Sequence, residues 1–253
     1  MLTANWIQKC WEKGDPLHGI SDALCGLHHY EPWTKRQLPL SWKMFSTWRK
    51  LESPDRAPPL AKQIIYAWAY YAVDHCDFIF AGLLLLEFFA LLRTGEILQV
   101  AAADILLDGR KGIISLRDTK TGKRDNVAEM VSFDDPFTIQ VLQALKALKV
   151  QQGLDKVPIW PYSGSAFRHR FKQYSDKFNL DQHKFRPYSL RRGGATHLFQ
   201  VTGSMEIALV KGRWSHARVA RIYISDGLSF LPRMTFTPKA RQLLHVWNPE
   251  STR

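Results

Sequence analysis

Cysteine is scarce in this chain, and the three cysteines present form no recognisable set. Cys10, Cys25 and Cys76 leave one thiol over in any pairing. Their spacing fits neither a disulfide framework nor the paired cysteines and histidines of a metal site. We therefore expect a reducing, intracellular compartment, and we predict neither a metal nor a cofactor.

The chain also lacks an apolar run long enough to cross a membrane. The longest run, residues 78–92, is interrupted by Glu87, whereas a spanning helix needs about 20 apolar residues. The start, Met1 to Trp6, has no basic residues followed by an apolar stretch, so we expect no signal peptide. We interpret residues 78–92 as a buried core helix and predict no membrane partner.

Acidic residues are few relative to basic ones. The chain has 23 Asp and Glu against 35 Lys and Arg, which gives a net charge of +12. Such an excess favours a polyanionic partner, because binding releases counterions. A charge that serves solubility, or a membrane-surface patch, is the alternative. With 253 residues, of which 45% are hydrophobic, the chain can bury a sizeable core in one or two domains.

Proline-rich residues 53–59 separate two parts of the chain, residues 1–52 and residues 60–253. Helical periodicity and start signals predict helices at 20–24, 42–48, 60–72, 77–100, 135–148, 165–178, 189–201, 204–211, 216–224 and 237–247. We predict N-caps at Ser41, Asp135, Ser165 and Thr237, and interpret residues 225–236 as a linker.

Two short segments rich in β-branched residues, 113–116 and 126–131, predict strands joined by a turn at 119–123. A second turn is predicted at Asp108-Gly109. The expected fold is therefore mainly α with one small antiparallel β-sheet, an α+β arrangement. In the helix at 165–178, aromatic residues recur at intervals of four, three and four, and we interpret this stripe as core.

Four segments stand out in order along the chain: LLRTGEI at 91–97, YSLRRGGATH at 188–197, GRW at 212–214, and Tyr223 nine residues after Trp214. Arginines present paired donors that suit phosphate oxygens, and a phenol can form a covalent intermediate. Over residues 60–230 the chain resembles the tyrosine recombinase (phage integrase) family. The resemblance implies the DNA breaking-rejoining catalytic domain of that family, with a partial helical core-binding domain in residues 1–52.

The resemblance implies a phosphate clamp made by Arg93 and Arg191, with Glu96 holding the Arg93 guanidinium in place. Without the resemblance, Arg93 would be read as a salt bridge to Glu96 or Glu87 at a helix end. Arg192 is expected to be structural or to contact the DNA backbone. Paired glycines inside a helix are costly, so we expect Gly193 and Gly194 to allow the close approach of another backbone.

Tyr188 departs from the family pattern, which has histidine three residues before the second arginine. An unperturbed phenol has a pKa of about 10 and is a poor general base at neutral pH. Tyr188 can still hydrogen-bond, and we expect it to position the phosphate. The departure favours reduced activity.

By the same resemblance Tyr223 is the nucleophile and Trp214 donates its ring N–H to a phosphate oxygen. Lys120, on the turn at 119–123, is expected to protonate the leaving 5′ oxygen, with Lys123 as the competing candidate. His216 is expected to cap a helix or to contact phosphate. For each of these residues the structural alternative is a solvated turn or ordinary core packing.

The implied activity is transesterification of DNA through a 3′-phosphotyrosyl link, by a nuclear or nucleoid protein with double-stranded DNA as partner. Rival readings are a type IB topoisomerase, a non-catalytic DNA-binding relic of a mobile element, and a helical structural protein with chance motifs. The helix at 237–247 is short and must dock, on its own domain or in a neighbouring protomer. From the second option we expect a monomer that assembles with other protomers on DNA sites.

Overall fold

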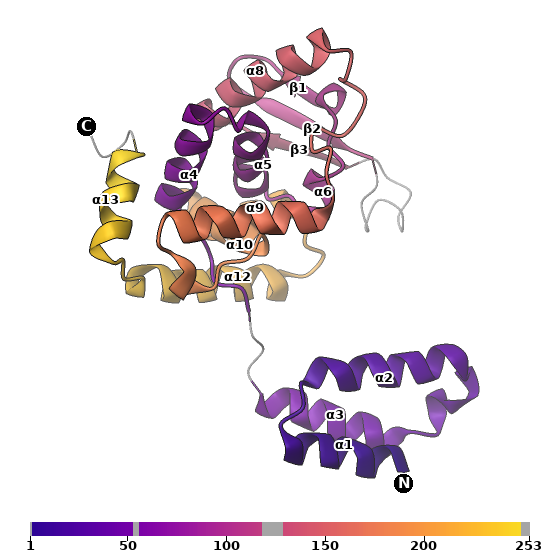
Figure 1. Cartoon of the computed structure of the whole chain (residues 1–253). Coiled ribbons are helices and arrows are strands. Elements are labelled where there is room, and N and C mark those ends of the chain that lie inside the picture. The colour runs from indigo at the N-terminus through magenta and orange to yellow at the C-terminus, as the bar shows by residue number, and fades with distance from the viewer. Residues whose placement is uncertain (1, 53–55, 118–128, 249–253) are drawn as a thin grey trace. The chain divides into compact units, whose positions relative to one another are not determined.

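The computed structural model of the chain describes residues 2–52, 56–117 and 129–248. It divides the chain into two compact units, Met1–Arg56 and Ala57–Arg253. Each unit has a hydrophobic core of its own, and Figure 1 shows the helices and strands of both units. None of the helices in the described parts of the chain combines the length and apolar character needed to span a bilayer.

The N-terminal unit is a small helical bundle. Its elements are α1 (Leu2–Lys13), α2 (Leu17–Tyr30), the 3-10 helix η1 (Pro32–Arg36) and α3 (Pro39–Leu51). The first helix is not predicted from the sequence. The predicted cap at Ser41 is wrong, because α3 begins at Pro39, whose missing N–H costs nothing in the first turn of a helix.

The second unit is built around α5 (Phe78–Phe89), which has no solvent-exposed face. Every residue from Phe80 to Phe88 is buried, and α4 (Lys62–Asp74), α8 (Pro136–Gln151) and α10 (Tyr188–Thr202) pack around it. The prediction of a core helix in this apolar run is confirmed.

The remaining elements carry a small sheet and the outer helices. They are α6 (Thr94–Ile97), η2 (Ala102–Asp104), β1 (Ile105–Leu107), β2 (Gly112–Leu116), β3 (Glu129–Phe133), α9 (Gly164–Lys177), η3 (Asp181–His183), α11 (Met205–Lys211), α12 (Ala217–Phe230), η4 (Leu231–Arg233) and α13 (Pro238–Val246). The strands are antiparallel in the order β1-β2-β3, with Ile114 opposite Ile105 and Val131. The α+β prediction is confirmed, although β1 is missed.

Side-chain caps start four of the described helices, those that follow Asp135, Ser163, Ser204 and Thr237, and each cap oxygen accepts a backbone N–H three residues later. Asp135 does so at 2.8 Å and Thr237 at 3.1 Å, as predicted. The cap of α9 is Ser163 at 3.2 Å rather than the predicted Ser165. Phe167, Phe171, Tyr174 and Phe178 are buried, so the interpretation of this stripe as core is confirmed.

The helix predicted over 77–100 is wrong as one element, because the chain turns between Phe89 and Thr94. α5 ends at Phe89, Leu91 takes a left-handed conformation with φ 50°, and a new short helix, α6, begins after Arg93. No glycine or proline marks residues 83–94, so the sequence carries no breaking signal there. The turn leaves Arg93 at the N-terminus of α6, one turn before Glu96.

The predicted linker at 225–236 is also wrong. α12 continues to Phe230 and is followed directly by η4. Gly227 is not a breaker here, because a side chain at this position would overlap Thr196 on α10. The glycine therefore lets α12 lie against α10.

α13 docks on its own domain. Ala240 and Leu244 are buried in the main core, and Trp247 packs edge-on against Tyr71 of α4 at 5.1 Å between ring centroids. Figure 1 shows α13 beside α4. In this structure α13 therefore takes the first of the two expected positions, on its own domain, and docking in a neighbouring protomer stays a prediction.

The paired glycines of α10 allow close backbone contacts, as predicted. A side chain at Gly193 would overlap the carbonyl oxygen of Leu60, and one at Gly194 would overlap that of Phe88 at the end of α5. Backbone atoms cannot move aside as a flexible side chain can. The two glycines therefore fix how closely α10 approaches α5.

We predict that Gly194→Ala lowers the free energy of unfolding by roughly 1–3 kcal/mol, the usual cost of overpacking. Gly95→Ala is the matched control, because nothing lies within 4 Å of the added methyl group there, and alanine is the better helix former. The midpoint of urea unfolding measures both. Equal stability of the two variants would contradict the close contact.

Candidate functional site

Glu96 on α6 gathers arginines from three parts of the chain. Its Oε1 accepts from Arg93 Nη1 and its Oε2 from Arg213 Nη2, both at 2.6 Å. Its Oε2 also lies 3.9 Å from Nη1 of Arg191 on α10. The backbone N–H of Arg93 donates to the same carboxylate at 2.7 Å. One buried carboxylate therefore holds three guanidinium groups together.

The arginines keep Glu96 ionised despite its burial. Burial alone would raise the pKa of this carboxyl, but hydrogen bonds and positive charge from Arg213 and Arg93 outweigh it and lower the pKa below its usual value. Arg213 is anchored a second time by Glu129 of β3 at 2.9 Å. The sheet and α6 thus share one ion-pair network.

Arg191 has the weakest ion pair of the three arginines, since its shortest distance to Glu96 is 3.9 Å. Its side chain is buried, and one nitrogen, Nη2, donates to the carbonyl of Gly212. The other, Nη1, is buried without a hydrogen bond among the described residues. Burial, followed by the positive charges of Arg93 and Arg213, lowers the pKa of Arg191 to about 10. Arg191 is therefore still charged at neutral pH.

The described ion pairs of the network leave it positively charged. Its three arginines, Arg93, Arg191 and Arg213, face two carboxylates, Glu96 and Glu129, so three positive charges meet two negative ones. One positive charge remains unbalanced. A bound anion with several acceptor oxygens, such as a phosphate, would supply both the missing charge and a partner for Arg191.

The aromatic side of the site begins at Arg191. Its guanidinium lies 5.1 Å from the ring centroid of Trp214, which is buried. The Trp214 ring in turn contacts Tyr223 of α12, at 5.2 Å between centroids. Tyr223 is half-buried. Contacts therefore run from Arg191 through Trp214 to Tyr223.

Two further residues of α10 hold Tyr223. The hydroxyl of Tyr188 is hydrogen-bonded to the hydroxyl of Tyr223. Arg192 is buried, lies 5.3 Å from the Tyr223 ring centroid, and forms an ion pair with Asp226 at 2.6 Å. Of the two roles predicted for Arg192, the structural one fits these contacts, because the guanidinium ties α10 to α12.

This combination of buried arginines and a held phenol sits in a known fold. XerA recombinase superposes with a TM-score of 0.56 at 15% identity, covering 90% of this chain and 81% of that one. The Tn1549 transposon integrase in complex with transposon right end DNA gives 0.63 at 14%, covering 95% and 82%. A lambda integrase dimer bound to a COC′ core site gives 0.55 at 16%, covering 88% and 63%. The fold is that of the tyrosine recombinases.

No protein-family model and no curated protein matches the sequence, so the likeness is one of structure. Within the recombinase fold, Arg93, Glu96, Tyr188, Arg191, Trp214 and Tyr223 form one contact network, although they come from four separate segments. Their catalytic roles remain predictions.

Other predicted residues lie elsewhere. Lys120 and Lys123 fall outside the described residues. His216 is exposed at the N-cap position of α12, but its side chain makes no capping hydrogen bond, so that predicted role is wrong. A contact between His216 and phosphate remains a prediction.

Sequence reasoning missed Arg213 and Glu129 as parts of the site. Arg213 stands within a recognised segment, next to Trp214, and its left-handed backbone, with φ 54°, turns its side chain toward Glu96. Residues other than glycine rarely take a left-handed backbone conformation. The residue types in the GRW segment therefore do not predict one at Arg213. Glu129 belongs to none of the four segments that the sequence singles out, so no motif predicts its place in the site.

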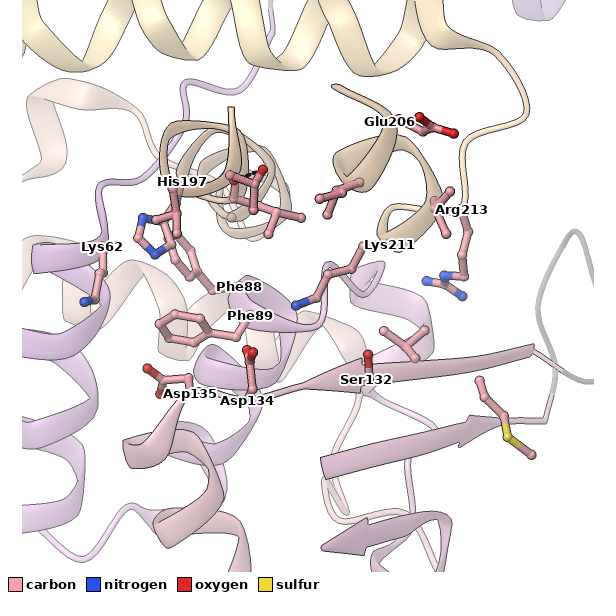
Figure 2. Close-up of a pocket in the computed structure, with 18 residues that line it drawn as sticks. Lys62, Phe88, Phe89, Ser132, Asp134, Asp135, His197, Glu206, Lys211 and Arg213 are labelled. Carbon is pink, nitrogen blue, oxygen red and sulfur yellow. Dashed lines mark hydrogen bonds between the residues drawn. The ribbon is translucent and has the colours of Figure 1, made fainter. Parts of the chain in front are cut away.

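A groove of about 800 Å³ borders the network on the side of β3 (Figure 2). Phe88 and Phe89 line its apolar part, and Asp134, Lys211 and Arg213 bring charge to it. Burial lowers the pKa of Lys211, against the opposing effect of Asp134. Arg213 belongs to both features, because it lines the groove and binds Glu96.

Glu87 lies beneath the site as a buried acid with a raised pKa. It is fully buried on α5, its Oε1 accepts from the Thr94 hydroxyl at 2.7 Å, and its Oε2 has no hydrogen bond among the described residues. Burial raises its pKa well above the usual value; the Thr94 hydrogen bond and the charge of Arg191 oppose the shift. The folded protein therefore holds a proton that the unfolded chain releases near pH 4.5.

We predict that Glu87→Gln, which keeps the shape without the titration, removes a pH dependence of stability. The raised pKa stabilises the wild type fully below pH 4.5, and this contribution is lost as pH rises toward the folded-state pKa. The melting temperature of the variant relative to wild type should therefore rise between pH 4.5 and 8, by roughly 2–4 °C for each kcal/mol.

The control for this measurement is Glu206→Gln, at an exposed glutamate of α11. It should show no such trend. A Glu87→Gln variant that becomes less stable than wild type as pH rises would contradict a raised pKa of Glu87.

Proposed function

We propose that this chain is a tyrosine recombinase that breaks and rejoins DNA by transesterification. The observation that carries the proposal is the contact network from Glu96 through Arg191 and Trp214 to Tyr223, within a recombinase fold. A phenol at the end of a positively charged, partly buried site is suited to attack a phosphodiester.

In the proposed reaction, the Tyr223 oxygen attacks the scissile phosphorus after losing its proton to water. The new bond joins Tyr223 to the 3′ phosphate, and the bond from phosphorus to the 5′ oxygen breaks. That oxygen takes up a proton and leaves as a 5′-hydroxyl. Because the phosphotyrosyl ester replaces the phosphodiester, a 5′-hydroxyl from a partner strand can reverse the step without an external source of energy.

Arg93 and Arg191 are proposed to bind the non-bridging oxygens, on which charge builds in the transition state. Two features support this role. Nη1 of Arg191 is buried without a hydrogen bond among the described residues, and Glu96 fixes the neighbouring arginines before substrate arrives. Donors that are fixed in advance need no reorganisation during the reaction. Trp214 is proposed to assist through its ring N–H.

Several parts of the proposal rest on the resemblance alone. Lys120 is proposed as the acid that protonates the 5′ oxygen, and the unit Met1–Arg56 as part of a core-binding domain. Duplex DNA and other protomers on DNA sites are the proposed partners, which the net charge of +12 suits. DNA as substrate would place the protein in the nucleus or nucleoid.

One observation favours a second candidate, a DNA-binding relic with impaired catalysis. Tyr188 occupies the position at which the family has histidine, and its hydroxyl engages the hydroxyl of the proposed nucleophile. A relic would bind DNA and yet form no covalent link to it.

A suicide substrate, in which a nick near the scissile phosphate lets the cleaved end diffuse away, separates the two candidates. We predict that the full chain forms a covalent protein–DNA adduct on a pool of nicked duplexes of random sequence, and that Tyr223→Phe forms none while it binds the pool normally. The ring and its packing survive in this variant. Adducts at the wild-type level from Tyr223→Phe would rule out the assignment, and binding without adducts from the wild type would favour the relic.

The clamp makes a separate prediction. Arg191→Ala should slow adduct formation by about 100-fold or more, as expected for the loss of a fixed donor, with a much smaller loss of affinity for DNA. Arg241→Ala, at an exposed residue of α13, is the control and should cleave normally. If Arg191→Ala cleaves at the normal rate but binds weakly, Arg191 is a binding residue only.

A further inference from the structure

The contact between Tyr188 and Tyr223 joins the two helices of the site at their reactive end. Tyr188 is the first residue of α10, and Tyr223 lies in α12. Their rings meet edge-to-face at 5.9 Å between centroids, and their hydroxyl groups share a hydrogen bond. Tyr188 is 38% exposed, so the pair lies where a large substrate can reach it.

The groups around this pair are cationic on the side of α10. Arg192 lies over the Tyr223 ring, and Arg191 follows one turn after Tyr188. Asp226 of α12 is engaged by Arg192, and Trp214, which packs against Tyr223 from the segment before α12, is uncharged. Arg191 and Arg192 would therefore stabilise negative charge on the Tyr223 oxygen.

Tyr188 holds its proton over the neutral range. Burial is the main reason, and the hydrogen bond to Tyr223 adds to it; together they raise the pKa of Tyr188 to about 12, against the opposing charges of Arg191 and Arg192. Across the neutral and mildly alkaline range Tyr188 is therefore a hydrogen-bond donor and cannot serve as a base.

We propose, resting on the function proposed above, that Tyr188 acts on the nucleophile: it donates its hydroxyl hydrogen bond to the Tyr223 oxygen, aims that oxygen and stabilises the negative charge on it during attack. This differs from the phosphate contact expected from the sequence. The Tyr188 proton stays on Tyr188 throughout. The Tyr223 proton leaves to water or hydroxide, the bond from Tyr223 to phosphorus forms, and the 5′ oxygen departs with a proton.

Because Tyr188 cannot accept a proton near neutrality and the Tyr223 proton must leave to water or hydroxide, adduct formation should speed up as pH rises from 6 to 9. Donation to a charged oxygen is stronger than an ordinary hydrogen bond, so its loss should slow the reaction by roughly 10- to 100-fold.

The test uses the full chain and the pool of nicked duplexes, with initial rates of adduct formation measured from pH 6 to 9. Tyr188→Phe keeps the ring and should lower the maximal rate by roughly 10- to 100-fold, with the DNA concentration for half-maximal rate unchanged. Tyr188→His should regain most of the rate and flatten the profile, because imidazole accepts a proton near neutrality. Tyr162→Phe, at an exposed tyrosine packed on Trp160, is the matched control.

Three results would overturn the proposal. A Tyr188→Phe variant as fast as the wild type would make the hydroxyl irrelevant, and a faster one would mean that Tyr188 restrains the nucleophile. A slower variant with a raised half-maximal DNA concentration and an unchanged maximal rate would place Tyr188 on the DNA instead. If the wild type and Tyr162→Phe both form no adduct, both the proposed function and this inference are wrong. The first three results contradict only the inference about Tyr188.

Discussion

The site depends on one buried carboxylate. Glu96 binds Arg93 and Arg213 at 2.6 Å and lies 3.9 Å from Arg191, so it joins the start of α6, the start of α10 and the turn before α12. Guanidinium groups repel one another and would spread apart without it. Because the described network still carries one unbalanced positive charge, Glu96 holds the arginines together without neutralising them. Glu96 thus keeps three arginines close together while a net positive charge remains.

The backbone around Glu96 is arranged to make this convergence possible. The left-handed Leu91 ends the central helix and starts α6, which places Arg93 and Glu96 one turn apart. Gly193 and Gly194 let α10 approach the end of α5 and Leu60, and this approach carries Arg191 inward. Gly227 does the same for α12, which carries Tyr223, against α10. Close packing and the ion pairs therefore depend on each other. Arg191 reaches Glu96, and Arg192 reaches Asp226, only because α10 lies close to α5 and α12.

Much of this was visible in the sequence. The mainly helical fold, the core helix at 78–92, the caps at Asp135 and Thr237 and the close approach at Gly193-Gly194 follow from local patterns and are confirmed by the structure. What the sequence did not predict depends on contacts between distant segments. Arg213 enters the site only through a left-handed turn, Gly227 resembles a helix breaker until Thr196 is beside it, and nothing in residues 83–94 signals the end of α5. The hydrogen bond between Tyr188 and Tyr223 joins residues 35 positions apart, which no local rule relates.

The central claim is that these charges and helices deliver one phenol, that of Tyr223, to a DNA phosphate. Peptide mapping by mass spectrometry tests it most directly. After incubation with nicked duplex DNA, the protein would be digested with nuclease and then with trypsin. Trypsin cleaves after Arg221 and after Arg233, so it would release residues 222–233 as one peptide. We predict that this peptide carries a nucleotide joined to Tyr223 through its 3′ phosphate. A nucleotide on any other residue, or one joined through its 5′ phosphate, would contradict the account.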